Sequence, residues 1–431
     1  MKQPIPPNIE LGKVDHSISS ALSLLRQTYI ALPDGGGWYH QLALDKPGPT
    51  ATALALSAFL ECEPSFEHFE DGLRFLTTRQ LRSADPLIQG GWALNTSSGR
   101  PVVEATAWVV RFLGMARCTQ LKATPDIELG YQWLLVNQNS DGGWGSLLGS
   151  PSRVWLTSLA LRALVHVDPY SRAVERGIEW LMSQQGSEPP GWGEIKGRNA
   201  TTTHTAMSLL AIGEVRPGWT DDRVLHAYEW LERHLDTANI DDQHARIESY
   251  NVAASATSGS LLWHTILMHY GLPTAVSALM RHPTGPQGGV VSSGYRTIIR
   301  TQLSSGAWRN IQGGNDASIW ALWPFIQALV DLKKLPISRG GDAILWTKDV
   351  IVVQRANSRP DALAELVRAR RRSVVQQYFA RYWSTLLVML SVLAGLVLVG
   401  ANSIELKDYL LGLIVPVALF GVQEYRSRKR G

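Results

Sequence analysis

Three acidic or imidazole side chains interrupt otherwise apolar helical stretches of this chain, and each could transfer a proton. They are Glu104, His204 and Asp316. Carboxyl and imidazole groups are the usual general acids and bases of enzymes. The structural alternative is that the two carboxylates lie in the first turns of helices, where negative charge is favourable, and that His204 is a hydrogen-bonded core residue. These three residues are the catalytic candidates, and the structural interpretation stays open beside them.

A second set of side chains on the same stretches could bind a ligand. Arg111 and Arg162 could hold a diphosphate, because guanidinium groups form paired hydrogen bonds with phosphate, although surface salt bridges are the alternative. Aromatic rings could line an apolar cavity and stabilise a positive charge through their faces, although core packing explains them equally well. The aromatic candidates are Trp108, Trp155, Trp263, Trp320 and Trp323.

These residues lie on a repeat of about fifty residues. Gly-Gly-Trp ends at Trp38, Trp92 and Trp144, and Pro-Gly-Trp ends at Trp192, so the successive spacings are 54, 52 and 48 residues. A fixed period of this length indicates a repeat architecture. Glycine permits the left-handed backbone that ends a helix, and the indole would then cover the junction with the next helix.

Each repeat predicts two helices from its apolar periodicity. Inner helices follow the tryptophans at 50–60, 104–113, 155–164 and 202–212, and outer helices precede them at 18–32, 66–80, 127–138 and 173–184. A fifth copy without its tryptophan continues into a helix-like run at 253–263. A sixth copy contains Trp308, with a Gly/Pro-rich insertion at 282–294 before it and an inner helix at 316–330 after it. The sequence therefore predicts an all-α fold of about six helix pairs, either an open solenoid or a closed ring.

Composition excludes several classes of protein. With 45% apolar and 18% charged residues the chain is a folded protein. Its net charge is only +4 and its basic residues gather near the C-terminus, so no nucleic-acid partner is expected. Cys62 and Cys118 are isolated from each other, which indicates neither a disulfide framework nor a zinc finger. We expect no metal site and no cofactor. The first residues carry no apolar run, so no cleaved secretory signal is expected.

One copy of the repeat resembles a known family. The segment Gln138-Asn139-Ser140-Asp141-Gly142-Gly143-Trp144 is similar to the Gln-x-x-Asp-Gly-Gly-Trp repeats of squalene-hopene and other terpenoid cyclases and of protein prenyltransferase β subunits. The resemblance covers residues 15–335 and is partial or weak in the other copies. It implies an α/α toroid whose inner helices surround an apolar cavity for an isoprenoid chain. The (α/α)6 barrel of some glycosidases and polysaccharide lyases is the alternative fold, but no catalytic carboxylate pair stands out.

The family's catalytic motifs are incomplete in this chain. Where class II cyclases have Asp-x-Asp-Asp, residues 313–317 place Asn315 at the central acid, and the acidic stretch at 236–242 has a different spacing. Prenyltransferases hold zinc through Asp, Cys and His. The fragments at His204 and Asp316 are similar to that site, but Ser318 replaces the cysteine and the order along the chain is reversed. The resemblance thus implies the scaffold more strongly than the chemistry.

Two apolar segments near the C-terminus predict a membrane hairpin. Residues 383–402 are twenty uncharged residues, enough to cross a bilayer core of about 30 Å. Residues 409–422 form a shorter run containing Pro416, which could span a thinned bilayer or be re-entrant. Arginines and lysines flank the hairpin on both outer sides, which places the toroid and both termini in the cytoplasm. A buried hairpin packed on the toroid is the alternative.

The expected domains are a toroid at 1–335, a connector with a basic helix at 336–380, in which residues 351–353 could form a strand, and a membrane hairpin with a basic tail at 381–431. We predict a multi-pass protein of the inner membrane that contacts the bilayer through residues 383–422. Its toroid would bind an isoprenoid-like or other lipid ligand, or a partner, without the family's catalysis. Bacterial defence proteins join sensing domains to two membrane helices, so a sensor or effector role is predicted by analogy. The alternative is a membrane-bound terpenoid cyclase or prenyltransferase acting on a polyprenyl substrate.

Overall fold

The computed structural model describes residues 9–40, 46–94, 99–116, 126–238, 246–253, 261–283, 288–309, 318–333, 343–346 and 351–354. The chain divides into two units, Met1–Ala356 and Asn357–Gly431, and all described residues belong to the first. The described part contains twelve helices and seven short strands.

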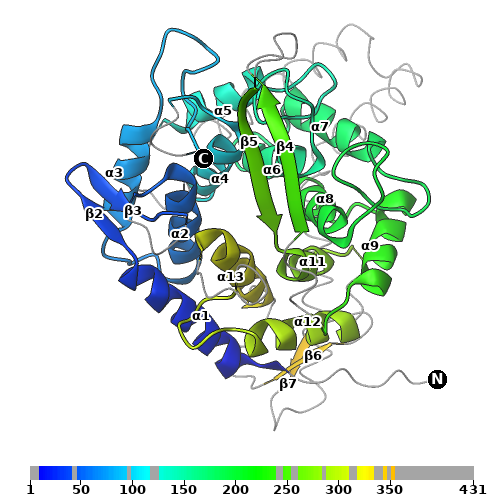
Figure 1. Cartoon of the computed structure of the whole chain (residues 1–431). Coiled ribbons are helices and arrows are strands. Elements are labelled where there is room, and N and C mark those ends of the chain that lie inside the picture. The colour runs from blue at the N-terminus through cyan, green and yellow to red at the C-terminus, as the bar shows by residue number, and fades with distance from the viewer. Residues whose placement is uncertain are drawn as a thin grey trace, which may run out of the picture. The chain divides into compact units, whose positions relative to one another are not determined.

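Six inner helices of this unit form a closed ring (Figure 1). Each contacts the next one along the chain, and the sixth returns to contact the first. Because the sixth inner helix contacts the first, the fold is a closed ring and not the open solenoid that the sequence also allowed. The inner helices are α2 (Pro49–Cys62), α4 (Val103–Ala116), α6 (Val154–Leu164), α8 (Thr202–Val215), α11 (Gly271–Leu279) and α13 (Ile319–Lys333).

Six outer helices surround this ring. Each packs mainly on the inner helix that precedes it in the ring, and the first outer helix packs on both the sixth and the first inner helices. The prediction of six helix pairs is therefore confirmed. The outer helices are α1 (Leu11–Gln27), α3 (Phe69–Arg79), α5 (Ile127–Val136), α7 (Arg172–Ser183), α9 (Asp222–His234) and α12 (Gly288–Arg300).

The repeat tryptophans join each outer helix to the next inner helix. The indole N–H of Trp144 donates to the main-chain oxygen of Leu134 at the end of α5, at 2.9 Å. Its backbone N–H donates to the hydroxyl of Thr157 in α6, at 3.0 Å. Trp38, Trp92 and Trp192 repeat both bonds, and Trp308 repeats the first. Because these indoles are almost completely buried, the repeat specifies a hydrogen-bonded corner between helices.

Glycine is required where four of the tryptophan loops meet the next outer helix, because Gly35, Gly90, Gly142 and Gly306 all have positive φ. Gly142 has φ +96°, and a Cβ there would lie 2.7 Å from the carbonyl oxygen of Arg176. Gly306 has φ +89° and lies against Ser20 in the same way. Gln302 donates from its amide to the main-chain oxygens of Ser17 and Gly306, both at 2.9 Å. The last loop thus contacts the first helix, and this contact helps to close the ring.

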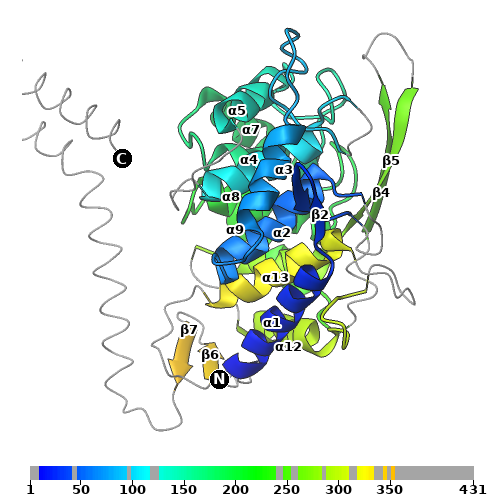
Figure 2. The same ribbon diagram turned by 90° about the vertical axis from the view of Figure 1, so that its left-hand side faces the viewer.

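The fifth repeat differs from the prediction. Its inner helix is α11, and two antiparallel strands, β4 (Arg246–Ala253) and β5 (Leu261–His269), lie between α9 and α11 in the sequence. We call this strand pair the hairpin. The helix-like run predicted at 253–263 is wrong at residues 253 and 261–263, which lie in strands, and residues 254–260 lie outside the described residues. The fold is mainly helical rather than all-α. Figure 2 shows the hairpin along one face of the ring. Its β-branched residues favour a strand, but the apolar alternation is irregular. Ile247 and Ile266 are exposed, whereas Glu248 is buried together with Val252.

Three smaller departures concern element boundaries. The first outer helix ends at Gln27, and residues 30–32 form β2 (Ile30–Leu32), which pairs with β3 (Gly35–Gly37). Part of the presumed insertion at 282–294 belongs to the helix α12. The strand predicted at 351–353 is confirmed as β7 (Ile351–Gln354). It pairs with β6 (Ala343–Trp346), which also pairs with β1 (Ile9–Glu10).

The predicted membrane segments, residues 383–402 and 409–422, lie outside the described residues. Within the described ranges, no helix combines the length and the apolar character needed to cross a bilayer.

Candidate functional site

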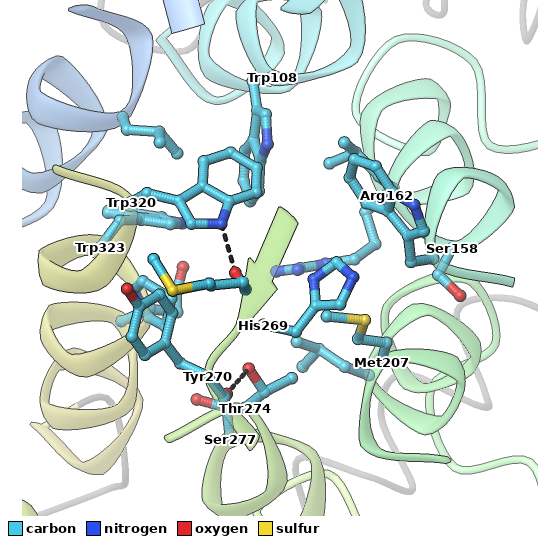
Figure 3. Close-up of a pocket in the computed structure, with 17 residues that line it drawn as sticks. Trp108, Ser158, Arg162, Met207, His269, Tyr270, Thr274, Ser277, Trp320 and Trp323 are labelled. Atoms are coloured by element: carbon cyan, nitrogen blue, oxygen red, sulfur yellow. Dashed lines mark hydrogen bonds between the residues drawn. The ribbon is translucent and has the colours of Figure 1, made fainter. Parts of the chain in front are cut away.

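The ring encloses a cavity of about 80 Å³ between the inner helices and the hairpin (Figure 3). Indoles, two methionines and a few polar groups form its wall. No carboxylate is among the described residues that line it. The lining residues are Leu54, Trp108, Trp155, Ser158, Leu159, Arg162, Met207, Leu210, Met268, His269, Tyr270, Thr274, Ser277, Trp320, Trp323, Pro324 and Gln327.

Three of the predicted aromatic candidates meet in this wall. The ring of Trp320 lies edge-on to those of Trp108 and Trp155, with centroids 6.2 and 6.4 Å apart. The indole N–H of Trp320 donates to the main-chain oxygen of Met268 at 2.6 Å, which ties α13 to the hairpin. Trp323 also lines the cavity. Four inner-helix indoles from α4, α6 and α13 therefore face one apolar space.

The cavity wall also holds buried polar atoms without a hydrogen-bond partner in the described part of the chain. They are Trp108 Nε1, Trp155 Nε1, Ser158 Oγ, Ser277 Oγ and Gln327 Oε1. A buried polar atom without a partner costs free energy. The wall can thus offer both donors and acceptors to a polar group of a ligand.

The predicted anion-binding arginines belong to one ion-pair cluster. Arg162 lies in the last turn of α6, where positive charge is favourable. Arg162 binds Glu214 through two contacts of 2.9 and 3.0 Å, and Arg111 lies 3.3 Å from the same carboxylate. Arg281 bridges Glu214 and Asp331. Burial opposes ionisation of Glu214, but the three arginines outweigh it and hold the pKa of this carboxyl far below its ordinary value. Arg162 lines the cavity, whereas Arg111 is buried beside it in the cluster.

A second polar cluster lies beneath the hairpin, at the N-terminal ends of the inner helices. Glu248 on β4 places Oε2 3.1 Å from His204 Nε2 and 3.0 Å from His269 Nε2, and its other oxygen pairs with Arg153. Burial opposes ionisation of Glu248, but the hydrogen bonds from the two histidines outweigh it and hold its pKa well below the ordinary value. Burial lowers the pKa of His269, although the hydrogen bond to Glu248 acts in the opposite direction. Thr201 Oγ1 lies 2.8 Å from His204 Nδ1.

These side chains include the one group of residues in the described part of the chain that could hold a metal ion. The ligand atoms of His204, Glu248 and His269 all lie within 4.8 Å of one another, and all three side chains are buried.

Glu104 lies in the first turn of α4 and also faces the hairpin. Its Oε1 accepts hydrogen bonds from the hydroxyls of Ser146 and Tyr250, the latter at 3.0 Å. Its Oε2 is buried without a hydrogen-bond partner in the described region. Burial raises the pKa of Glu104, and the nearby Glu248 carboxylate acts in the same direction. Glu104 is thus a buried weak acid outside the cavity lining.

Two candidates are not brought to either cluster by the described structure. Asp316 lies outside the described residues. Trp263 lies on β5 opposite Val252. The sequence reasoning missed Glu248, Tyr250 and His269. The available signal was the content of β-branched and aromatic residues in 246–253 and 261–269, which is typical of strands.

Residues 94–208 match the family described as the A-macroglobulin TED domain. A squalene–hopene cyclase of Bradyrhizobium diazoefficiens is 29% identical over 164 residues, which are 35% of this chain and 23% of that cyclase. The chain thus matches less than a quarter of the length of this curated relative.

Similarity to a solved structure supports the observed fold. A family 76 glycoside hydrolase from a bovine Bacteroides thetaiotaomicron strain superposes with a TM-score of 0.52 at 12% identity, covering 75% of this chain and 78% of the hydrolase. This chain folds as an α/α toroid. A type II terpene cyclase, MstE from Scytonema, is similar at a TM-score of 0.49 and 13% identity, over 75% of this chain and 98% of the cyclase.

Proposed function

We propose that this chain is a membrane-anchored toroid that binds an apolar, isoprenoid-like ligand in its central cavity without cyclising or transferring it. One observation carries the proposal: the described cavity wall is built from indoles and methionines and contains no carboxylate. Aromatic and thioether side chains are typical of sites for apolar ligands. The partial match to a squalene–hopene cyclase favours an isoprenoid within that class.

Cyclisation of an alkene needs an acid directed at a double bond. Glu104, a buried carboxyl whose pKa burial raises, has its hydrogen bonds under the hairpin and does not line the cavity. This separation favours binding over acid-initiated cyclisation.

The size of the cavity limits how the ligand enters. Its volume of about 80 Å³ is roughly half of the 150 Å³ cavity that accommodates benzene in an engineered protein. Only the end of a prenyl chain therefore fits without rearrangement. Met207 and Met268 lie in the wall, and methionine side chains adapt readily because they are unbranched. We propose that their movement admits the rest of the chain.

The membrane part of the proposal rests on residues 383–422, whose charge-free runs favour insertion. The basic residues on both sides favour a toroid on the cytoplasmic face of the inner membrane. An anchor there would hold the cavity near a supply of membrane-soluble prenyl chains. The sensor or effector role in bacterial defence stays a prediction.

Equilibrium binding of a fluorescent geranylgeraniol derivative to the full-length chain in detergent tests the proposal. Ser277→Leu adds carbon atoms to the cavity wall, so we expect it to weaken binding at least tenfold, which is about 1.4 kcal/mol. Ser23→Leu, at an exposed position on α1, is the matched control and should bind like the wild type. Equal binding by all three proteins would contradict a cavity site. Conversion of the ligand to a new product, abolished by Glu104→Gln, would instead favour the enzyme.

A further inference from the structure

The polar cluster beneath the hairpin has no role in the proposed binding of an apolar ligand in the cavity. We propose that His204, Glu248 and His269 bind one divalent transition-metal ion, with zinc the ion that best fits this set of ligands. Two imidazoles and one carboxylate form a known type of zinc site with three protein ligands.

The positions of the ligand atoms fit such an ion. Zinc–nitrogen and zinc–oxygen bonds of about 2.0–2.2 Å place neighbouring ligands of a tetrahedron about 3.4 Å apart. The two Nε2 atoms lie 3.1 and 3.0 Å from Glu248 Oε2. These two separations are within a few tenths of an ångström of the tetrahedral value, and the three ligand atoms all lie within 4.8 Å of one another.

The surrounding groups hold the ligands in orientation. The Thr201 hydroxyl lies beside Nδ1 of His204, so Nδ1 can carry the proton while Nε2 presents its lone pair to the ion. Arg153 holds Oε1 of Glu248, which leaves Oε2 as the atom that faces both imidazoles. Arg153 in turn lies over the ring of Tyr250, 3.8 Å from its centroid. Outer contacts of this kind fix ligand geometry in metal sites.

The three ligands come from separate elements, which gives the ion a structural consequence. His204 lies in the first turns of α8, Glu248 on β4 and His269 at the end of β5. A bound ion would cross-link both strands of the hairpin to the ring. His269 also lines the cavity, so the metal site and the cavity share one wall.

Metal titration of the full-length chain in detergent tests this site. Co²⁺ is the probe, because tetrahedral Co²⁺ absorbs strongly in the visible range, and Zn²⁺ is then added in competition. We expect one equivalent of Co²⁺ per chain, displaced by Zn²⁺. Glu248→Gln preserves the shape of the side chain but removes its charge, and should weaken metal binding by about 100-fold. His269→Gln should do the same.

His264→Gln is the matched control, because His264 is an exposed histidine on the same strand whose Nδ1 lies 2.7 Å from Asn251 Oδ1. It should bind metal like the wild type. The helix content of each variant is measured by circular dichroism without metal, and zinc should raise the unfolding temperature of the wild type and His264→Gln only. Absence of stoichiometric binding by the folded wild type would overturn the proposal. Equal affinity of Glu248→Gln and the wild type would overturn it as well, because the ion would then lie elsewhere.

Discussion

Trp320 donates its indole N–H to the main-chain oxygen of Met268 at 2.6 Å, and this bond joins the sixth inner helix to the hairpin that covers the ring. Both residues also line the cavity. The wall that would contact a ligand is thus held by a hydrogen bond between elements about fifty residues apart in the sequence.

Replacing Trp320 should loosen the hairpin. Trp320→Phe removes the bond to Met268 and leaves a carbonyl without its donor, which costs on the order of 1 kcal/mol. Hydrogen exchange followed by mass spectrometry should show faster exchange in residues 261–269. Trp108→Phe serves as the control, because the indole N–H of Trp108 has no partner in the described structure. Similar exchange in the two variants would mean that the bond does not hold the hairpin.

The repeat tryptophans and the cavity tryptophans should differ in their contribution to stability. Trp144→Phe breaks a buried bond to Leu134 and should lower the free energy of unfolding by about 1–3 kcal/mol more than Trp155→Phe. Trp155 is nearly as buried, but its N–H has no partner in the described region. Urea unfolding of both variants measures the difference. Equal losses of the free energy of unfolding would show that packing of the indole ring, and not its hydrogen bond, is the contribution of the repeat tryptophans to stability.

Two buried glutamates should give opposite pH dependences of stability. Burial raises the pKa of Glu104, so its contribution to folding is full below the ordinary pKa and is lost as pH rises through the folded value. Glu104→Gln should therefore become more stable relative to the wild type between acidic and neutral pH. Despite burial, the surrounding arginines lower the pKa of Glu214, so its contribution is present at neutral pH and is lost on acidification.

Glu214→Gln should accordingly cost about 3–5 kcal/mol at neutral pH, because it leaves three arginines around an uncharged group, and the cost should shrink at acidic pH. Urea unfolding at a series of pH values measures both profiles. Glu175→Gln, at a largely exposed ion pair with Arg216, provides a control with little pH-dependent change. Parallel profiles for Glu104→Gln and Glu214→Gln would refute these assignments.

Deleting residues 381–431 should release the protein from membranes, because it removes both apolar runs and the basic tail. Fractionation with alkaline carbonate washing compares the deletion with the full-length chain. Continued sedimentation of the truncated toroid with membranes would contradict the predicted anchor.

The sequence predicted those parts of the fold whose signal is local. The Gly-Gly-Trp loops recur at a nearly fixed period, and the helices beside them carry their own apolar spacing, so nine of the helices could be placed from neighbouring residues. Ring closure could not be read this way, because it depends on contacts such as that of Gln302 with Ser17. The hairpin was missed because its buried face mixes polar residues such as Glu248 with apolar ones such as Val252, so that the sequence shows no regular alternation.

The residues of the candidate sites divide in the same way, into those that local sequence identifies and those that only the fold brings together. Trp108, Trp155 and Trp320 could be chosen because inner-helix aromatics are recognisable in the repeat, and the fold brings them together. Pairing of Arg111 and Arg162 with Glu214 was not foreseen, since these residues lie on three different inner helices. Glu248 reaches His204 only through the inserted hairpin. Such long-range partners leave no trace in local spacing.

The most direct test of the account is photo-crosslinking with a geranylgeraniol that carries a diazirine at its apolar end, followed by mapping of the labelled peptides. The account predicts adducts in the inner helices that wall the cavity, at residues 154–164 and 319–333, and their loss in Ser277→Leu. Labelling confined to outer helices such as residues 172–183, or unchanged in Ser277→Leu, would contradict a ligand site in the centre of the ring.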